Sequence, residues 1–392
     1  MPVSEWNETP WQKIDKQYIS SMECETFYSV GYDIDPNNKK RYILTVSYEY
    51  RNNSVFLVVE SIFSLKKVRK TPDITYIANT SARQNGYTLD ENQLTADVAE
   101  MVRFELLLTE VIIFFTWRKN IPILFLYRMT IEELQNYYNN LNITAPTAKI
   151  DFLEIIQHMC NEANVHVNSS EPLLVYNSKF LHELATLLGN TSQRTLVNYV
   201  QWNMVKKFML YTTQEMRNIK LATSDNFTDT TPRWKTCVND LEMKTAISYI
   251  FVKRYMPDYV IHETMKMVKN MKEELRNRLE RTHWLPSSIK LNMLQKIDDY
   301  GIEIGYPEWY KNDDAVTRYY DGLSIGSDYF QNILNALKKK SQKLEILRQV
   351  VKKSRWVDYP TTYNAYYFAE TNTICECHKN KISIFHILLL TN

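Results

Sequence analysis

Residues 356–372 read WVDYPTTYNAYYFAETN, and no other segment of the chain says as much about its fold. The middle of this segment, Asn364-Ala365-Tyr366-Tyr367, is by itself typical of a plain strand with an asparagine at its edge. The asparagine side chain offers both a hydrogen-bond donor and an acceptor. A strand near residue 364 is therefore the first element that we expect.

A second strand region is expected near the start of the chain. Residues 28–33 and 42–48 are two runs that flank the tetrapeptide Asp35-Pro36-Asn37-Asn38. Aspartate, proline and asparagine are residues that favour tight turns between strands. This pattern predicts a strand pair within a strand-rich segment near residues 28–60.

Between these two ends, apolar residues recur with the spacing of α-helices. One helix is expected from Asp151, where Glu154 is placed to complete a capping box. Ser178 is expected to cap a second helix that Gly189 ends in the left-handed conformation, and Ser192 to open a third. A long, otherwise charged helix carries an apolar stripe of Ile261, Met265, Val268, Met271, Leu275 and Leu279. The predicted fold class is mainly α, with a small β component.

The composition excludes several classes of function. The chain has 47 Lys and Arg against 45 Asp and Glu, so no basic excess indicates a nucleic-acid partner. Its 392 residues, 44% hydrophobic and 23% charged, are typical of a globular protein of about two domains. Only 7 glycines are present, which disfavours phosphate-binding loops and dinucleotide-binding fingerprints.

Glycosylation sequons indicate the cellular location of the protein more clearly than targeting segments do. The opening residues lack the apolar stretch of a secretory signal. Residues 106–127 are apolar but interrupted by charges and a proline, so we expect a buried helix and a second apolar segment there, and no membrane span. The sequons favour an extracellular or cell-surface glycoprotein. They lie at Asn7, Asn52, Asn79, Asn142, Asn168, Asn190 and Asn226.

The histidines and cysteines form no complete metal-binding motif. Two dipeptides begin like the helical His-Glu-x-x-His zinc motif, His182-Glu183 and His262-Glu263. Thr186 and Lys266 stand where the second histidine is required one helical turn later, so neither dipeptide is a zinc site. The run Cys375-Glu376-Cys377-His378 has no second pair of ligands nearby to complete a tetrahedral site.

Residues 356–372 resemble the neprilysin and endothelin-converting-enzyme family of zinc metallopeptidases. Four further segments of the chain also resemble this family, and they occur in the family's order. In that family a Trp and a Pro precede Val-Asn-Ala-Tyr/Phe-Tyr. The other four segments are VGYDIDPNNKKRYIL (residues 30–44), LYRMTIEELQ (126–135), TPRWKTCVNDLEMKTAISYIFVKRYM (231–256) and LQKIDDYGIEIGYPEW (294–309). The resemblance therefore covers the chain from about residue 30 to residue 374.

The resemblance implies two mostly helical lobes and a peptide-binding strand. Residues 1–305 would form the lobe that limits substrate access, and residues 306–392 the incomplete start of a catalytic lobe of the zincin type. In the family, the segment that matches residues 364–367 is an exposed edge strand against which peptide substrates lie. Asn364 is then the first candidate for substrate contact, followed by Ala365, Tyr366 and Tyr367.

The resemblance stops where the family's zinc site should follow. After the segment that matches residues 372–374, the family continues with Phe-Pro-Ala-Gly-Ile-Leu, His-Glu-x-x-His and Glu-x-x-x-Asp, which hold zinc and the catalytic base. Residues 375–392 read CECHKNKISIFHILLLTN and have no family counterpart. We expect no cofactor and no catalytic residue within these 392 residues. Cys237 matches a family disulfide position, and Cys24 is one candidate partner.

The primary functional interpretation is therefore a truncated, neprilysin-like metalloendopeptidase that does not hydrolyse peptides by itself, in effect a pseudoenzyme. Three alternatives stay open. The chain is part of an active zinc endopeptidase, it is a secreted decoy that binds peptides without cleaving them, or it is a helical interaction module unrelated to peptides. Whether a zinc motif belongs to the same protein separates the primary interpretation from the first alternative.

Overall fold

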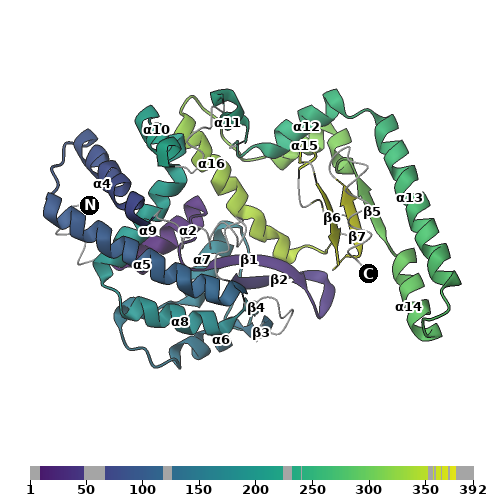
Figure 1. The fold of residues 1–392 in the computed structure, drawn as a ribbon, viewed down its shortest axis with the longest axis horizontal. Helices are drawn as coiled ribbons and strands as arrows, with labels where there is room; N and C mark the ends of the chain where they lie inside the picture. Colours follow the sequence, from purple (N-terminus) through teal and green to yellow (C-terminus); the bar gives the residue numbers. More distant parts are fainter. Residues whose placement is uncertain are drawn as a thin grey trace. The chain divides into compact units, whose positions relative to one another are not determined.

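The computed structural model describes residues 9–47, 67–117, 126–223, 232–239, 241–351, 356, 359–362, 364–369 and 371–376 (Figure 1). The chain folds into two compact units, each made of several segments. The first unit comprises Met1–Asp33, Ile43–Arg233 and Ser324–Gln349, and the second comprises Ile34–Tyr42, Trp234–Leu323 and Val350–Asn392. Because both units are discontinuous in sequence, neither corresponds to a division at residue 305, and the predicted family lobes remain a prediction.

A four-stranded sheet in the order β1-β2-β4-β3 belongs to the first unit, except for Ile34–Tyr42 around the turn from β1 to β2, which is assigned to the second. The strands of this sheet are β1 (Ser29–Asp35), β2 (Asn38–Ser47), β4 (Pro172–Tyr176) and β3 (Leu126–Thr130). β2 runs parallel to β4, with Leu44 opposite Leu173, whereas β3 is antiparallel to β4. The predicted strand pair at the start of the chain is confirmed. At its turn the Asp35 carboxylate accepts from the Asn37 amide at 2.9 Å and from Arg41 Nε at 2.7 Å.

Helices make up most of the first unit, which confirms the mainly α fold class. They are α2 (Trp11–Met22), α4 (Lys67–Gln84), α5 (Glu91–Trp117), α6 (Ile131–Asn139), α7 (Phe152–Glu162), α8 (Ser178–Gly189), α9 (Gln193–Phe208), α10 (Gln214–Thr223) and α16 (Tyr329–Ser341). Short 3-10 helices lie at η2 (Pro146–Ala148), η3 (Met209–Tyr211) and η5 (Gln342–Arg348). None of the helices within the described ranges is long and apolar enough to cross a bilayer.

Aromatic side chains form the centre of this unit's core. Phe27, just before β1, packs edge to face on Trp11 of α2, with ring centroids 4.8 Å apart. Phe27 also contacts Phe104 of α5 and Tyr199 of α9, and the last two rings are 4.9 Å apart. Edge-to-face pairs of this kind add to the free energy of apolar burial. One cluster of rings thus joins three helices to the sheet.

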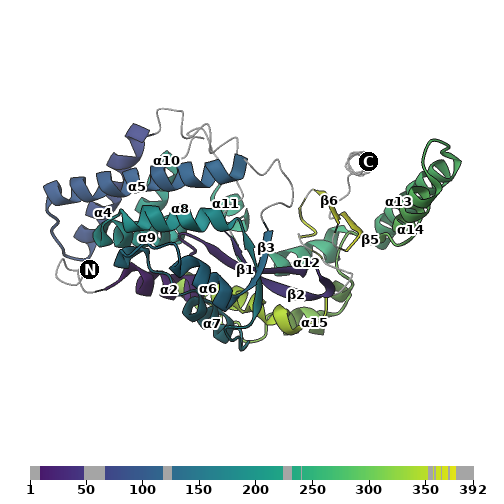
Figure 2. The same ribbon diagram turned by 90° about the horizontal axis from the view of Figure 1, so that it is seen from below.

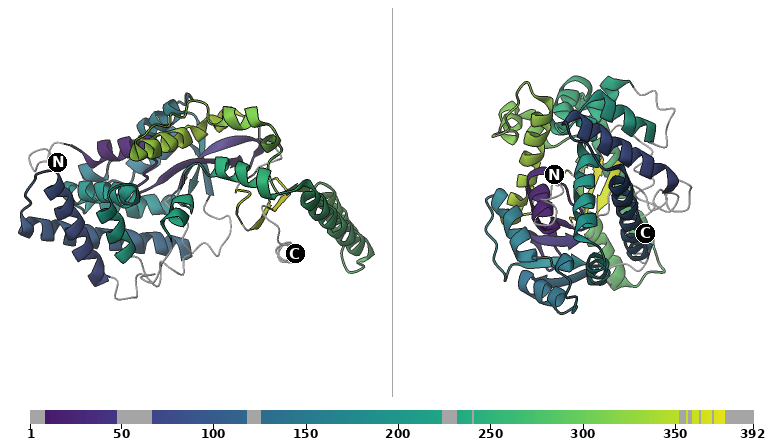
Figure 3. Two further views of the ribbon diagram at one scale, coloured as in Figure 1. Left: turned by 90° about the horizontal axis from the view of Figure 1, so that it is seen from above. Right: turned by 90° about the vertical axis from the view of Figure 1, so that its left-hand side faces the viewer.

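The helix α16 returns to this unit from a distant part of the sequence. It lies against α2 (Figure 3). Its buried Ile333 and Leu337 form a core cluster with Phe208 at the end of α9. Phe330 adds a ring contact to Phe208 at 5.7 Å.

The predicted helix starts are correct for α9 and only half correct for α7. Ser192 caps α9, its side chain accepting from the Thr195 amide at 3.1 Å. Asp151 caps α7 by accepting from the Glu154 amide, but the Glu154 carboxylate forms an ion pair with Lys16 of α2. The capping box predicted there is therefore wrong, because a tertiary ion pair holds the side chain that would complete it.

Both predicted ends of α8 differ from the observed ends. Ser178 is the first helical residue and forms no side-chain cap, while Asn177 precedes it with φ 62°. Gly189 stays within the helix, and the cap that follows is Asn190 with φ −90°. A Cβ at position 189 would lie 3.0 Å from Ile143 Cγ2. Glycine is favoured there because the side chain of Ile143 in a neighbouring loop packs closely, not because the backbone is left-handed.

The second unit combines helices with a three-stranded sheet. Its helices are α11 (Arg233–Asn239), α12 (Lys244–Tyr255), α13 (Asp258–Arg281), α14 (Ser287–Asp298), η4 (Glu308–Lys311) and α15 (Asp313–Tyr319). The strands are β5 (Gly301–Ile304), β6 (Ala365–Phe368) and β7 (Thr373–Glu376), in the order β5-β7-β6. Helices α13 and α14 lie side by side (Figure 2).

The apolar stripe predicted on the long helix packs against β5. Val268 of α13 and Ile304 of β5 form a buried cluster with Ile261, Met265 and Met271. Directly after β5, Gly305 has φ +84°, and a Cβ on it would lie 2.2 Å from Ile261 Cδ1. Glycine suits this position because the backbone is left-handed, and any side chain would also require the end of the Ile261 side chain to shift.

Gly305→Ala should destabilise the second unit more than Gly322→Ala. Gly322 also has positive φ, +78°, but nothing lies within 4 Å of its added Cβ. We expect Gly322→Ala to cost about 1 kcal/mol from backbone strain and Gly305→Ala about 1–3 kcal/mol more from the clash. The measurement is the free energy of unfolding from urea denaturation. Adding Ile261→Val, which removes the clashing methyl group, should recover part of the difference, and equal losses for the two alanine variants would contradict the steric argument.

Candidate functional site

The predicted peptide-binding strand lies at the edge of the second unit's sheet. β6 pairs antiparallel with β7, Tyr367 standing opposite Ile374, and β7 pairs parallel with β5 on its other side (Figure 1). Among the described residues, no strand pairs with the outer side of β6. A strand in this position presents main-chain N–H and C=O groups that another extended chain can bond.

Asn364 is exposed immediately before β6, and its side chain is turned back onto its own strand. Its Oδ1 accepts from the Ala365 amide at 2.9 Å, and its Nδ2 donates to Tyr366 Oη at 2.8 Å. Both polar ends of the side-chain amide therefore have local partners. A peptide that binds to Asn364 would exchange these local hydrogen bonds for intermolecular ones.

Side chains of β6 alternate between the two faces of the sheet. Tyr366 and Phe368 lie on one face with their rings stacked, the centroids 6.1 Å apart. Ala365 and Tyr367 lie on the opposite face, where Ala365 is buried and Tyr367 contacts the Tyr300 ring at 5.5 Å. The four candidate residues lie together because they are consecutive in the sequence. Their side chains point to opposite faces of the sheet because side chains alternate along a β-strand.

The segment that leads into β6 is anchored on α12. Ser248 of α12 is fully buried, and its hydroxyl lies 3.3 Å from the hydroxyl of Thr361. The nearby Tyr320 Oη accepts from the Ala246 amide at 2.8 Å, and Tyr310 Oη donates to the Thr245 carbonyl. Burial raises the pKa of Tyr310 and of Tyr320, so both phenols stay protonated at physiological pH. Sequence reasoning missed Ser248, Tyr310 and Tyr320 because each of the three lies more than forty positions from Asn364.

The described residues do not fit a zinc ion. They contain no group of three His, Cys, Asp or Glu side chains that could hold a metal. His182 Nδ1 lies 3.6 Å from its neighbour Glu183, while Thr186, one turn later, donates its hydroxyl to the His182 carbonyl. Cys375 is buried in β7, and Cys377 and His378 lie outside the described residues.

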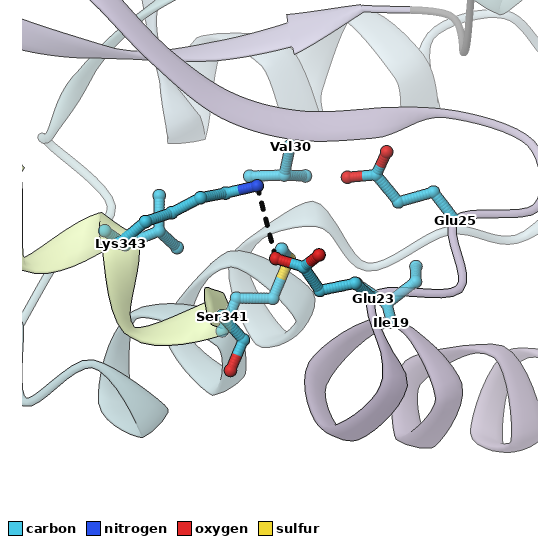
Figure 4. A pocket seen from close by; sticks show the side chains of 8 residues that line it. Ile19, Glu23, Glu25, Val30, Ser341 and Lys343 are labelled. Carbon is cyan, nitrogen blue, oxygen red and sulfur yellow. Dashed lines mark ion pairs between the residues drawn. The ribbon is translucent and has the colours of Figure 1, made fainter. Parts of the chain in front are cut away.

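A small pocket in the first unit is occupied by structural ion pairs. It lies between the end of α2, α7 and the junction of α16 with η5 (Figure 4). Glu23 stands within it and pairs with Lys340 at 3.1 Å and with Lys343 at 3.4 Å. Lys207 donates to the Met22 carbonyl at 2.7 Å and to that of Glu23. These contacts tie the end of α2 to α9 and α16, which is a structural role.

Four of the seven predicted sequons lie within the described residues. Asn142, Asn168 and Asn190 are exposed next to helix ends or in turns. Asn79 is half-buried within α4, and its Nδ2 donates to Glu91 Oε1 at 3.1 Å. The sequons at Asn7, Asn52 and Asn226 lie outside the described residues.

Cys237 lies half-buried on α11 and forms no disulfide within the described part of the chain. Cys24 is buried before β1 in the other unit. The pairing of these two cysteines therefore stays a prediction. Cys160 is fully buried on α7, where burial first and the Glu171 carboxylate second raise the pKa of its thiol to about 12.

Comparisons with known proteins agree on one family. The family model described as "Peptidase family M13" matches residues 3–307. The chain is 24% identical over 386 residues to endothelin-converting enzyme 1 of Mus musculus, covering 94% of this chain and 48% of that protein. It is 22% identical over 363 residues to neprilysin-11 of Caenorhabditis elegans, covering 89% and 42%. The chain spans about half the length of these curated relatives.

Solved structures show the same fold at lower identity. The zinc metalloprotease Zmp1 of Mycobacterium tuberculosis, in complex with an inhibitor, superposes with a TM-score of 0.73 at 15% identity, covering 95% of this chain and 54% of that one. PepO of Lactobacillus rhamnosis superposes with a TM-score of 0.67 at 15% identity, covering 93% and 55%.

When the chain passes through a secretory pathway, we expect glycans at Asn142, Asn168 and Asn190 and little or none at Asn79. A helical, half-buried asparagine that already donates a hydrogen bond is a poor acceptor for a bulky surface modification. Single Asn→Gln changes followed by gel mobility and mass spectrometry provide the measurement. Asn79→Gln is the control and should leave the mobility unchanged. A mobility shift caused by this change would contradict the prediction that Asn79 carries little or no glycan.

At pH about 8, Cys237 should react with a maleimide reagent much faster than Cys160. The raised pKa of Cys160 means that its thiol stays protonated below about pH 12, and burial also blocks access. Mass spectrometry of timed labelling reactions on the folded chain would measure both sites. Comparable rates at the two cysteines would show that α7 opens readily.

Proposed function

Because the chain belongs to peptidase family M13, we propose that it provides the peptide-holding part of a neprilysin-type metalloendopeptidase. An extended peptide binds as an added strand along the free edge of β6, with Asn364 as the main side-chain contact. The observation that supports this most directly is the position of β6, which has β7 on one side only among the described strands. Of the residues 364–367 that the sequence resemblance selected, 365–367 belong to β6 and Asn364 immediately precedes it, which supports the proposal.

The chemistry of the edge favours main-chain recognition. A free strand edge offers alternating N–H and C=O groups to any peptide backbone, so affinity does not depend on one peptide sequence. The Asn364 amide can donate and accept at once, which suits the paired C=O and N–H of a peptide unit. Extended peptides are therefore the proposed ligand class.

We assign peptide holding, not bond cleavage, to these 392 residues. The sequence contains no His-Glu-x-x-His, and the described residues hold no group of three metal ligands. In the family, zinc supplies a Lewis acid and an activated water, and hydrogen bonds along a strand edge do not replace that chemistry. Residues 306–392 are proposed to begin the catalytic lobe, and residues 1–305 to form the lobe that limits substrate access.

The names of the relatives suggest where the protein acts. One is an endothelin-converting enzyme and another a neprilysin. We propose an extracellular or cell-surface location and secreted peptides as ligands, which also accounts for the exposed sequons. Retained peptide binding without metal would equally suit the decoy interpretation.

Asn364→Ala should weaken binding of a fluorescein-labelled, alanine- and leucine-rich peptide of about ten residues by about tenfold, because two hydrogen bonds to the peptide main chain are lost. Fluorescence anisotropy measures the affinity. Asn292→Ala, an exposed asparagine on α14 in the same unit, is the matched control and should bind like the wild type.

Two further measurements separate the mechanisms. The same peptide with N-methylated main-chain amides should bind poorly, since methylation removes the ladder donors. Binding should persist in a metal chelator. Equal binding of the methylated peptide, or complete loss in chelator, would overturn strand addition as the mode of recognition.

A further inference from the structure

Asn372 occupies the turn between β6 and β7 and contacts three separate elements. Its backbone is left-handed, with φ 50°. Its carbonyl accepts from the Gly301 amide at 2.9 Å, at the start of β5. Its Nδ2 donates to the Lys296 carbonyl of α14 at 2.7 Å, and its Oδ1 accepts from Tyr367 Oη of β6 at 3.0 Å.

The contact to α14 satisfies a group that the helix leaves open. Lys296 lies in the last turn of α14, which ends at Asp298. Carbonyls in the last turn of a helix have no amide four residues further along to accept from. The Asn372 amide takes that place, so the turn of the β6–β7 hairpin serves as a side-chain cap for α14.

The contact between Asn372 and Tyr367 connects the end of α14 to the edge strand β6. The Tyr367 ring contacts the Tyr300 ring, with centroids 5.5 Å apart, and Lys296 Nζ lies over it at 5.7 Å from its centroid. Its hydroxyl is held by Asn372. Because Tyr367 is the third residue of β6, fixing its side chain fixes the rotation of the strand about its own axis. That rotation sets where the N–H and C=O groups of the free edge point.

Few residues suit position 372. The left-handed backbone is open to glycine and, at modest strain, to asparagine and aspartate. Glycine offers no side-chain contact, and an ionised aspartate keeps the acceptor for Tyr367 but loses the donor for the Lys296 carbonyl. Asparagine alone of the three meets the backbone, the donor and the acceptor requirements together.

We propose that Asn372 is a positioning residue for peptide binding, which orients the free edge of β6 by linking Tyr367 to the end of α14. This inference rests on the proposed function and deepens it, because it assigns the geometry of the binding edge to a residue that does not touch the peptide. It predicts that affinity changes when the link is cut, even while the chain stays folded.

The test uses the 392-residue chain and the labelled peptide described above, at a temperature where every variant is folded by circular dichroism. Asn372→Gly keeps the left-handed turn and removes only the side chain, and Tyr367→Phe removes only the hydroxyl. We expect about tenfold weaker binding for Asn372→Gly and about fivefold for Tyr367→Phe. The double variant should be no weaker than Asn372→Gly alone, since both changes break one link.

Asn372→Asp provides a readout that a purely structural role would not give. With the carboxylate ionised at pH 7, the variant chain should bind peptide weakly. Its affinity should recover as the pH falls through the ordinary aspartate pKa of about 4, because protonation restores the donor for the Lys296 carbonyl. Asn372→Gly should show no such recovery. Hydrogen exchange of the β6 amides should rise in Asn372→Gly and stay unchanged in the Asn292→Ala control.

The outcomes separate this inference from the proposed function. If Asn364→Ala loses affinity while Asn372→Gly and Tyr367→Phe bind like the wild type, strand addition stands and the positioning role is wrong. Additive losses in the double variant, or a flat pH profile for Asn372→Asp, would also overturn it. If the wild-type chain does not bind the peptide, the proposed function fails, and the inference that rests on it fails as well.

Discussion

The second unit depends on the close approach of β7 to β5. β7 is the central strand of its sheet, and Thr373, Ile374 and Cys375 are all buried. Opposite Thr373 stands Gly301, where a Cβ would lie 2.6 Å from Thr373 Oγ1. The absence of a side chain at position 301 lets the two backbones pair. Without this pairing β6 and β7 would form an isolated two-stranded hairpin, and β6 would not be the edge of a three-stranded sheet.

The same unit uses glycine twice for different physical reasons. At Gly301 the constraint is contact with Thr373 across a strand pair, and at Gly305 it is a left-handed backbone pressed against Ile261. Gly301 is the first residue of β5 and Gly305 follows its last, and β5 connects the apolar stripe of α13 to the central strand. The motif Ile304-Gly305-Tyr306-Pro307, which contributed to the family resemblance, therefore marks a packing constraint.

Local patterns predicted those elements whose stability comes from nearby residues. The strand pair around Asp35, the cap at Ser192 and the stripe of α13 all follow from spacings of a few residues, and all are confirmed. The failures lie where a distant residue intervenes. Glu154 pairs with Lys16, and Gly189 faces Ile143, so neither adopts the role that its immediate neighbours suggested. Contacts across long stretches of chain leave no periodic trace in the sequence.

The sequence by itself determined the mainly α fold class, the family resemblance, the four residues of the candidate edge and the lack of a complete zinc motif. These conclusions need only residue identities and short spacings. Only the tertiary structure decided that β6 lies at an edge, that Asn364 turns back on Tyr366, and that Asn372 links the strand to α14. The reason is physical, since each of these facts depends on main-chain and side-chain directions that are set when segments distant in sequence pack together.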